Sequence, residues 1–146
     1  MLEGLLKNPW EFQQTFETPL KTLRLFVKMI QSVGEPLQAG SLTIDLVVFE
    51  PKDLIGMLTR YSIPSQPARG LCLIAGGEQE VEELLVTVLS EWIDFLFIPQ
   101  PELFVIYADH DEYTTFYTHT RTKLERLAHA LSAQGFKAVP NYERQF

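Results

Sequence analysis

The stretch Leu103–His119, LFVIYADHDEYTTFYTH, decides the fold of the C-terminal half of this chain. It holds two runs of aromatic and β-branched residues, which flank the polar segment Asp109-His110-Asp111-Glu112. Aromatic and β-branched residues favour strands, and a polar turn between two such runs is typical of a β-hairpin. We therefore predict a hairpin with strands near 103–108 and 113–119 and with the acidic residues at its turn.

The same stretch also permits a helix. Apolar residues recur at helical spacing from Asp111 to Gln134, and Asp109 and Glu112 have the spacing of a capping box. The acidic cluster would then mark the start of a helix. A second capping box lies directly before Lys123 to Ala133, which has better helix formers, so the pattern favours a hairpin followed by a separate helix.

The segments on either side of this stretch show alternating helical and strand patterns. The predicted helices are 9–17, 19–33, 52–61, 78–96 and 123–133, and the predicted strands are 42–48, 71–75, 103–108, 113–119 and 137–139. The element order ααβαβαββαβ indicates an α+β (mixed α/β) single domain. We expect an N-terminal helical hairpin in residues 1–34 and, in residues 41–146, a mixed sheet of four to five strands with helices packed against it.

The charge of the chain is strongly uneven. Its 146 residues carry a net charge of −7, and residues 70–120 contain ten Asp or Glu but no Lys or Arg. Proteins that bind nucleic acids usually present a positive surface to the phosphates, so we do not expect nucleic-acid binding. An acidic surface attracts basic proteins, and we therefore expect a protein partner with a basic surface.

The only cysteine, Cys72, allows neither an internal disulfide nor a zinc site built from several cysteines. It lies in the apolar run LCLIA, and we predict a buried, unreactive thiol. The N-terminal segment MLEGLLKNPW lacks the pattern of a signal peptide, and no apolar run approaches the ~20 residues that span a bilayer. We therefore expect a cytoplasmic protein that does not enter a membrane.

The first functional hypothesis is a non-enzymatic binding domain of the inhibitor, immunity or adaptor type, without a cofactor. Tyrosine rings supply rigid contact area, and carboxylates steer a basic partner toward the surface. The residues that we predict to form this surface are Tyr107, Asp109, Asp111, Glu112, Tyr113 and His119.

The second hypothesis is a small hydrolase that uses a divalent metal or acid–base catalysis. Asp109, His110, Asp111 and His119 are the predicted metal ligands, with Glu112 beside them, because carboxylates and imidazole suit divalent cations. The order D-H-D-E matches no ligand spacing with a fixed geometry, unlike HExxH on a helix. A polar turn or a helix cap explains the same residues, since Asp readily bonds nearby backbone amides.

Overall fold

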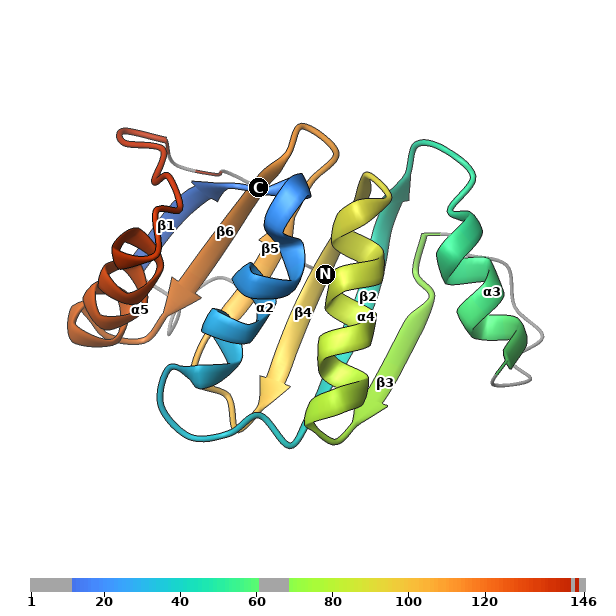
Figure 1. Ribbon diagram of the computed structural model, residues 1–146, viewed down its shortest axis with the longest axis horizontal. Helices are drawn as coiled ribbons and strands as arrows, with labels where there is room; N and C mark the ends of the chain where they lie inside the picture. The colour runs from blue at the N-terminus through green and yellow to red at the C-terminus, as the bar shows by residue number, and fades with distance from the viewer. Residues whose placement is uncertain (1–11, 61–68, 143, 145–146) are drawn as a thin grey trace.

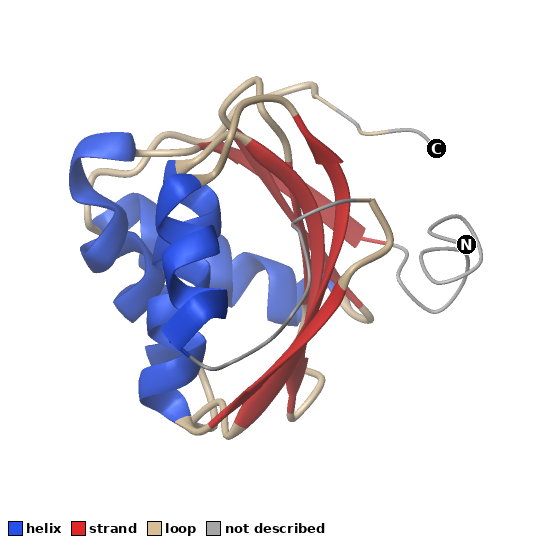
Figure 2. Cartoon of the chain, turned by 90° about the vertical axis from the view of Figure 1, so that its right-hand side faces the viewer, coloured by secondary structure: helices blue, strands red, loops and turns tan. Residues whose placement is uncertain are grey.

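Six strands and four α-helices make up the part of the chain that the computed structural model describes, residues 12–60, 69–142 and 144. The strands form one curved sheet, and the four helices pack on one of its faces (Figure 2). The elements are β1 (Phe12–Glu17), the 3-10 helix η1 (Leu20–Thr22), α2 (Leu23–Ser32), β2 (Ala39–Val47), α3 (Lys52–Arg60), β3 (Cys72–Gly76), α4 (Glu78–Ser90), β4 (Ile93–Gln100), β5 (Val105–Ala108), β6 (Tyr113–Thr118) and α5 (Arg121–Ala133).

The strand order across the sheet is β1-β6-β5-β4-β2-β3, and every neighbouring pair is antiparallel (Figure 1). The predicted mixed sheet of four to five strands is therefore wrong in strand count and direction, whereas the α+β class is confirmed. The described residues contain no helix with both the length and the apolar composition that crossing a bilayer requires.

The predicted hairpin is confirmed. β5 and β6 pair from Val105↔Tyr117 to Ala108↔Thr114, and residues 109–112 form the turn. The alternative helix that begins at Asp111 is wrong, because 113–118 is a strand between β5 and β1. A separate helix follows, as predicted, and the Thr120 side chain caps it by accepting a hydrogen bond from the Lys123 amide.

The predicted N-terminal helical hairpin is wrong. Its second helix is present as α2, but residues 12–17 of the first form the strand β1, which pairs with β6. The beginning of that predicted helix, residues 9–11, lies outside the described residues. Pairing with β6 overrides the local helical pattern, because Phe16 reaches the core in the strand and Thr15 bonds Thr115 across the pair at 2.7 Å.

The predicted helix 78–96 is also too long. α4 ends at Ser90, and residues 93–100 form β4, which lies between β5 and β2. Trp92 has a φ of +53°, a conformation that breaks the helical backbone. Five successive residues from Ile93 are buried, and all of them except Asp94 are apolar, so their pattern resembles the continuation of a helical stripe.

β3 is an edge strand rather than the strand buried on both faces that the sequence predicted. Its burial alternates along the strand, and 73% of Ile74 is exposed. Cys72 is exposed too, so the predicted buried thiol is wrong. The physical reason is that the helices cover only one face of the sheet, and this strand has a partner, β2, on one side only. At the other edge, the predicted last strand 137–139 is reduced to a single antiparallel bridge, between Ala138 and Phe16.

Phe116 lies at the centre of an aromatic cluster that joins the hairpin to the helices. Its ring makes edge-to-face contacts with Phe16 (6.0 Å between centroids), Phe26 (6.2 Å) and Phe104 (6.2 Å). All four rings are almost fully buried. This packing anchors the helix-facing side of the hairpin in the core. The other face of the hairpin and its turn are therefore held in a fixed position.

We expect the substitution Phe116→Ala to lower the free energy of unfolding by about 3–5 kcal/mol, because it leaves a cavity between three other rings. Phe49→Ala is the matched control, since 63% of Phe49 is exposed. That control should change stability by less than about 1 kcal/mol. Urea unfolding followed by circular dichroism measures both, and equal losses would contradict this description of the core.

Candidate binding surface

Asp109 organises the turn of the hairpin through its carboxylate. Oδ1 accepts hydrogen bonds from the backbone amides of Asp111 (2.9 Å) and Tyr113 (3.3 Å). The Glu112 amide donates to the Asp109 carbonyl at 3.2 Å, and Glu112 has a φ of +67°. These bonds fix the backbone of residues 109–113, which is the usual role of Asp in a tight turn.

The other carboxylate oxygen of Asp109 binds Arg144. Its Oδ2 lies 2.7 Å from Arg144 Nη2, and the two side chains are only 8% and 10% exposed. The guanidinium lies over the ring of Tyr107, 4.6 Å from its centroid, and Nε donates to Thr115 Oγ1 at 3.3 Å. Asp109 therefore joins residues near the C-terminus to the helix-free face of the sheet.

Asp94 holds the next residue of the turn. Its Oδ1 accepts a hydrogen bond from the backbone amide of His110 (2.7 Å), and the same oxygen lies 2.8 Å from Nδ1 of the His110 ring. The hydrogen bond to Asp94 raises the pKa of His110 above its ordinary value, and the charges of Asp94, Asp111 and Asp109 act in the same direction. The pair ties the turn to β4.

The remaining predicted partner-binding residues have different surroundings. Tyr107 is buried, and its hydroxyl donates a hydrogen bond to Asp45 Oδ2 at 2.5 Å. Burial raises the pKa of Tyr107, and the hydrogen bond to Asp45 raises it further. Tyr113 is half-buried, and its ring lies 5.1 Å from that of Tyr142. Asp111 and Glu112 are exposed at the turn, whereas His119 follows β6 at the far end of the hairpin.

The structure does not bring the four predicted metal ligands together. A six-residue strand, ~20 Å long, separates His119 from the turn. Asp109 is engaged by Arg144, and the Nε2 of His110 is 3.9 Å from Asp111 Oδ1. Among the described residues there is no group of three or more His, Cys, Asp or Glu side chains that could hold a metal ion.

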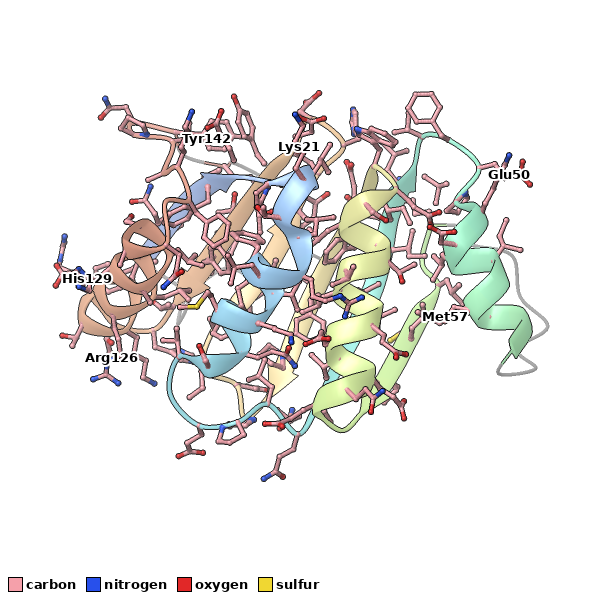
Figure 3. All side chains as sticks on the ribbon, in the orientation of Figure 1. Lys21, Glu50, Met57, Arg126, His129 and Tyr142 are labelled. Carbon is pink, nitrogen blue, oxygen red and sulfur yellow. The ribbon has the colours of Figure 1, made fainter. Side chains whose placement is uncertain are left out.

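An exposed apolar patch lies at the same end of the sheet as the turn. Its members, with their exposed fractions, are Leu46 (43%), Val48 (41%), Phe49 (63%) and Trp92 (39%). The rings of Phe49 and Trp92 are in edge-to-face contact, with centroids 5.9 Å apart. Leu46 pairs with Asp94, which bonds His110, so the patch adjoins the turn. Glu50 follows the patch and points away from the body of the molecule (Figure 3).

We call these four apolar residues together with Asp111 and Glu112 the turn-end surface. Its apolar half was not predicted from the sequence. Trp92 lies within the predicted helix 78–96, a prediction that does not reveal its exposure. The available signal was Phe49, a large apolar residue in the short connection between the predicted strand 42–48 and the predicted helix 52–61, because connecting segments run over the protein surface.

Several of the acidic residues in the basic-free segment have structural roles. Glu91 caps α3 by accepting from the amides of Asp53 (2.7 Å) and Leu54 (3.1 Å), and Glu82 pairs with Arg24 at 2.6 Å. Asp94 and Asp109 bind His110 and Arg144, as described above. The negative charge is thus partly used inside the fold, and Asp111 and Glu112 are the carboxylates that the turn leaves exposed.

The chain matches no protein-family model, and no curated protein or solved structure matches it.

We expect the pKa of His110 to be higher than about 6.5, the ordinary histidine value, and to fall in Asp94→Asn. A raised pKa means that the pair contributes stability below the unfolded pKa and loses it as the pH rises through the folded value. The stability lost in His110→Gln should therefore be larger at pH 5.5 than at pH 8.5. NMR titration of the imidazole and urea unfolding at the two pH values measure these effects. A normal pKa that Asp94→Asn leaves unchanged would contradict the assignment.

Proposed function

We propose that this protein is a non-enzymatic binding domain of the inhibitor, immunity or adaptor type, whose turn-end surface binds a protein partner with a basic surface. The observation that carries the proposal is an exposed Phe49–Trp92 pair at the same end of the sheet as two exposed carboxylates on a braced turn. Contiguous exposed apolar side chains with a polar rim are typical of protein-interaction sites.

The two halves of the turn-end surface have complementary roles. Trp92 and Phe49 present large rigid rings, and such residues often supply most of the binding energy of an interface. Asp111 and Glu112 lie at the margin, where charges steer the approach of an oppositely charged partner and set its orientation. Protein–protein interfaces commonly combine an apolar centre with a charged margin.

The turn is also rigid enough for this role. Asp109 is fixed by Arg144 and by two backbone amides, and Asp94 holds His110. Carboxylates on a fixed backbone lose little further freedom when a partner binds, so less of the interaction free energy is spent on ordering them. The same contacts favour a role of residues 109–112 in binding a partner over a role in catalysis.

The test is affinity capture with the full chain as bait, at about 50 mM and at about 500 mM salt, where the screening lengths differ several-fold. We expect the wild type to retain a partner with a basic surface at low salt. We expect both Trp92→Ala and the double variant Asp111→Lys/Glu112→Lys to lose that partner, the first through the apolar contact and the second through the charge.

The matched control is Glu102→Lys/Glu125→Lys, which changes the net charge equally at two other exposed positions. This control should retain the partner, and thermal unfolding should show that all variants are folded. Equal loss of the partner in the control and in the turn variant would overturn the proposed site. Retention that does not depend on salt would overturn the electrostatic part of the proposal.

A further inference from the structure

The outer edge of β3 offers backbone hydrogen-bonding groups that the sheet does not use. On either side of β3, the Leu71 carbonyl accepts from the Ile44 amide of β2 at 2.9 Å, and the Gly77 amide donates to the carbonyl of Gln38, directly before β2, at 2.6 Å. Because backbone groups alternate along a strand, those of Cys72, Ile74 and Gly76 point away from β2. The hydrogen bond from the Gly76 amide to Glu80 Oε1, at 3.2 Å, agrees with this direction.

The two edges of the sheet differ in how they are protected. At β1, the backbone at 137–139 bonds the strand, because Glu17 donates to Lys137 at 2.9 Å and Val139 donates to Thr15 at 2.8 Å. β3 has no comparable bridge among the described residues, and its exposed side chains, Cys72 and Ile74, are uncharged. An edge with these properties is suited to pairing with another strand.

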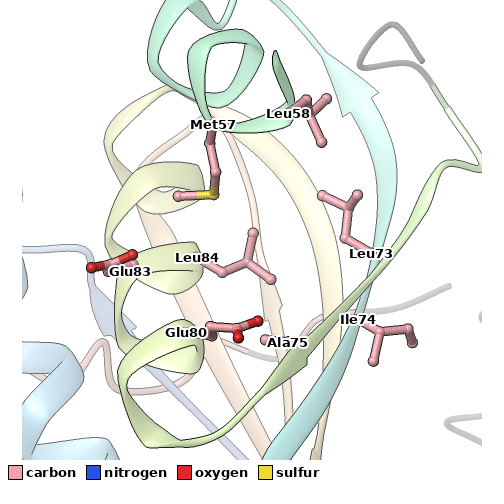
Figure 4. A pocket seen from close by; sticks show the side chains of 8 residues that line it. All are labelled: Met57, Leu58, Leu73, Ile74, Ala75, Glu80, Glu83 and Leu84. Atoms are coloured by element: carbon pink, nitrogen blue, oxygen red, sulfur yellow. The ribbon is translucent and has the colours of Figure 1, made fainter. Parts of the chain in front are cut away.

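An apolar groove opens directly beside this edge. It lies between β3 and the helices α3 and α4, has a volume of about 230 Å³, and is lined on its apolar side by Met57, Leu58, Leu73 and Leu84 (Figure 4). α3 lies on the side of β3 away from β2 (Figure 1). A strand paired with β3 would therefore place every second side chain toward the groove.

Two carboxylates, those of Glu80 and Glu83, stand on α4 at the margin of the groove (Figure 4). They favour a positively charged residue in whatever binds there. A second copy of this chain fits less well. Its β3 would supply backbone groups, but Leu73 and Ala75 of that copy are buried in their own core and could not fill the groove.

We propose that the β3 edge and this groove bind an extended peptide segment of another protein, which adds a seventh strand to the sheet. The peptide pairs with the outward backbone groups of Cys72 and Ile74 and places an aliphatic side chain in the groove. Side chains two residues apart on a strand lie on the same face, ~7 Å from each other. A Lys or Arg at that spacing reaches Glu80 or Glu83. This site is separate from the turn-end surface and does not depend on the function proposed for it.

The test uses a display library of random linear nonapeptides, with the full chain as bait. We expect enrichment of peptides with an aliphatic residue and a Lys or Arg two positions away. One enriched peptide is then synthesised, and its affinity is measured by calorimetry. Ile74→Pro removes an outward amide, which edge strands tolerate, and should weaken binding about tenfold or more. Glu83→Lys should weaken it as well.

Matched controls are Cys72→Ser, which keeps the backbone groups, and Glu125→Lys, which makes the same charge change on α5. Both should bind the peptide as the wild type does. If Ile74→Pro does not fold, amide exchange in the wild type replaces it, and the peptide should slow exchange at Cys72 and Ile74. The proposal is overturned by the absence of enrichment, by equal binding to Glu83→Lys and the wild type, or by a dimer of the chain that occupies this edge.

Discussion

The carboxylate of Asp109 is the contact on which the arrangement of the C-terminal half depends. One of its oxygens closes the β5–β6 turn, and the other binds Arg144, which lies over Tyr107 on the helix-free face of the sheet. The side chains of Asp109 and Arg144 are both largely buried, so removing either one would leave the buried charge of the other without a partner. The turn, the position of Arg144 and the exposure of Asp111 and Glu112 are thereby coupled.

The hairpin and its separate capped helix could be predicted from the sequence because their signals are local. Two β-rich runs around a polar segment, and a capped helix with glycine after its end, need no knowledge of distant neighbours. β1 and β4 could not be predicted in this way. Residues 12–17 are a strand because β6 is available beside them, and β4 is almost entirely buried because it lies in the interior of the sheet, between β5 and β2. Tertiary context overrides a local helical pattern in both cases.

The candidate site was predicted only in part for the same reason. Asp111 and Glu112 are exposed at a turn, as the sequence suggested, but the role of Asp109 depends on Arg144, which lies 35 residues away in the chain. The exposure of Trp92 could not be foreseen, because it follows from the end of α4 and the start of β4 on either side of it. A stretch that resembles a histidine–carboxylate active site in sequence is, in three dimensions, a braced turn beside an apolar patch.

A double-mutant cycle on Asp109 and Arg144 tests most directly whether this pair braces the turn. Asp109→Asn keeps an oxygen for the turn amides while removing the charge, and Arg144→Gln removes its partner. The free energies of unfolding of the wild type, the two single variants and the double variant give the coupling between the residues. We predict a coupling of at least about 1 kcal/mol, as expected for a largely buried pair. A coupling near zero would show that the turn holds its shape without Arg144 and that the pair does not brace it.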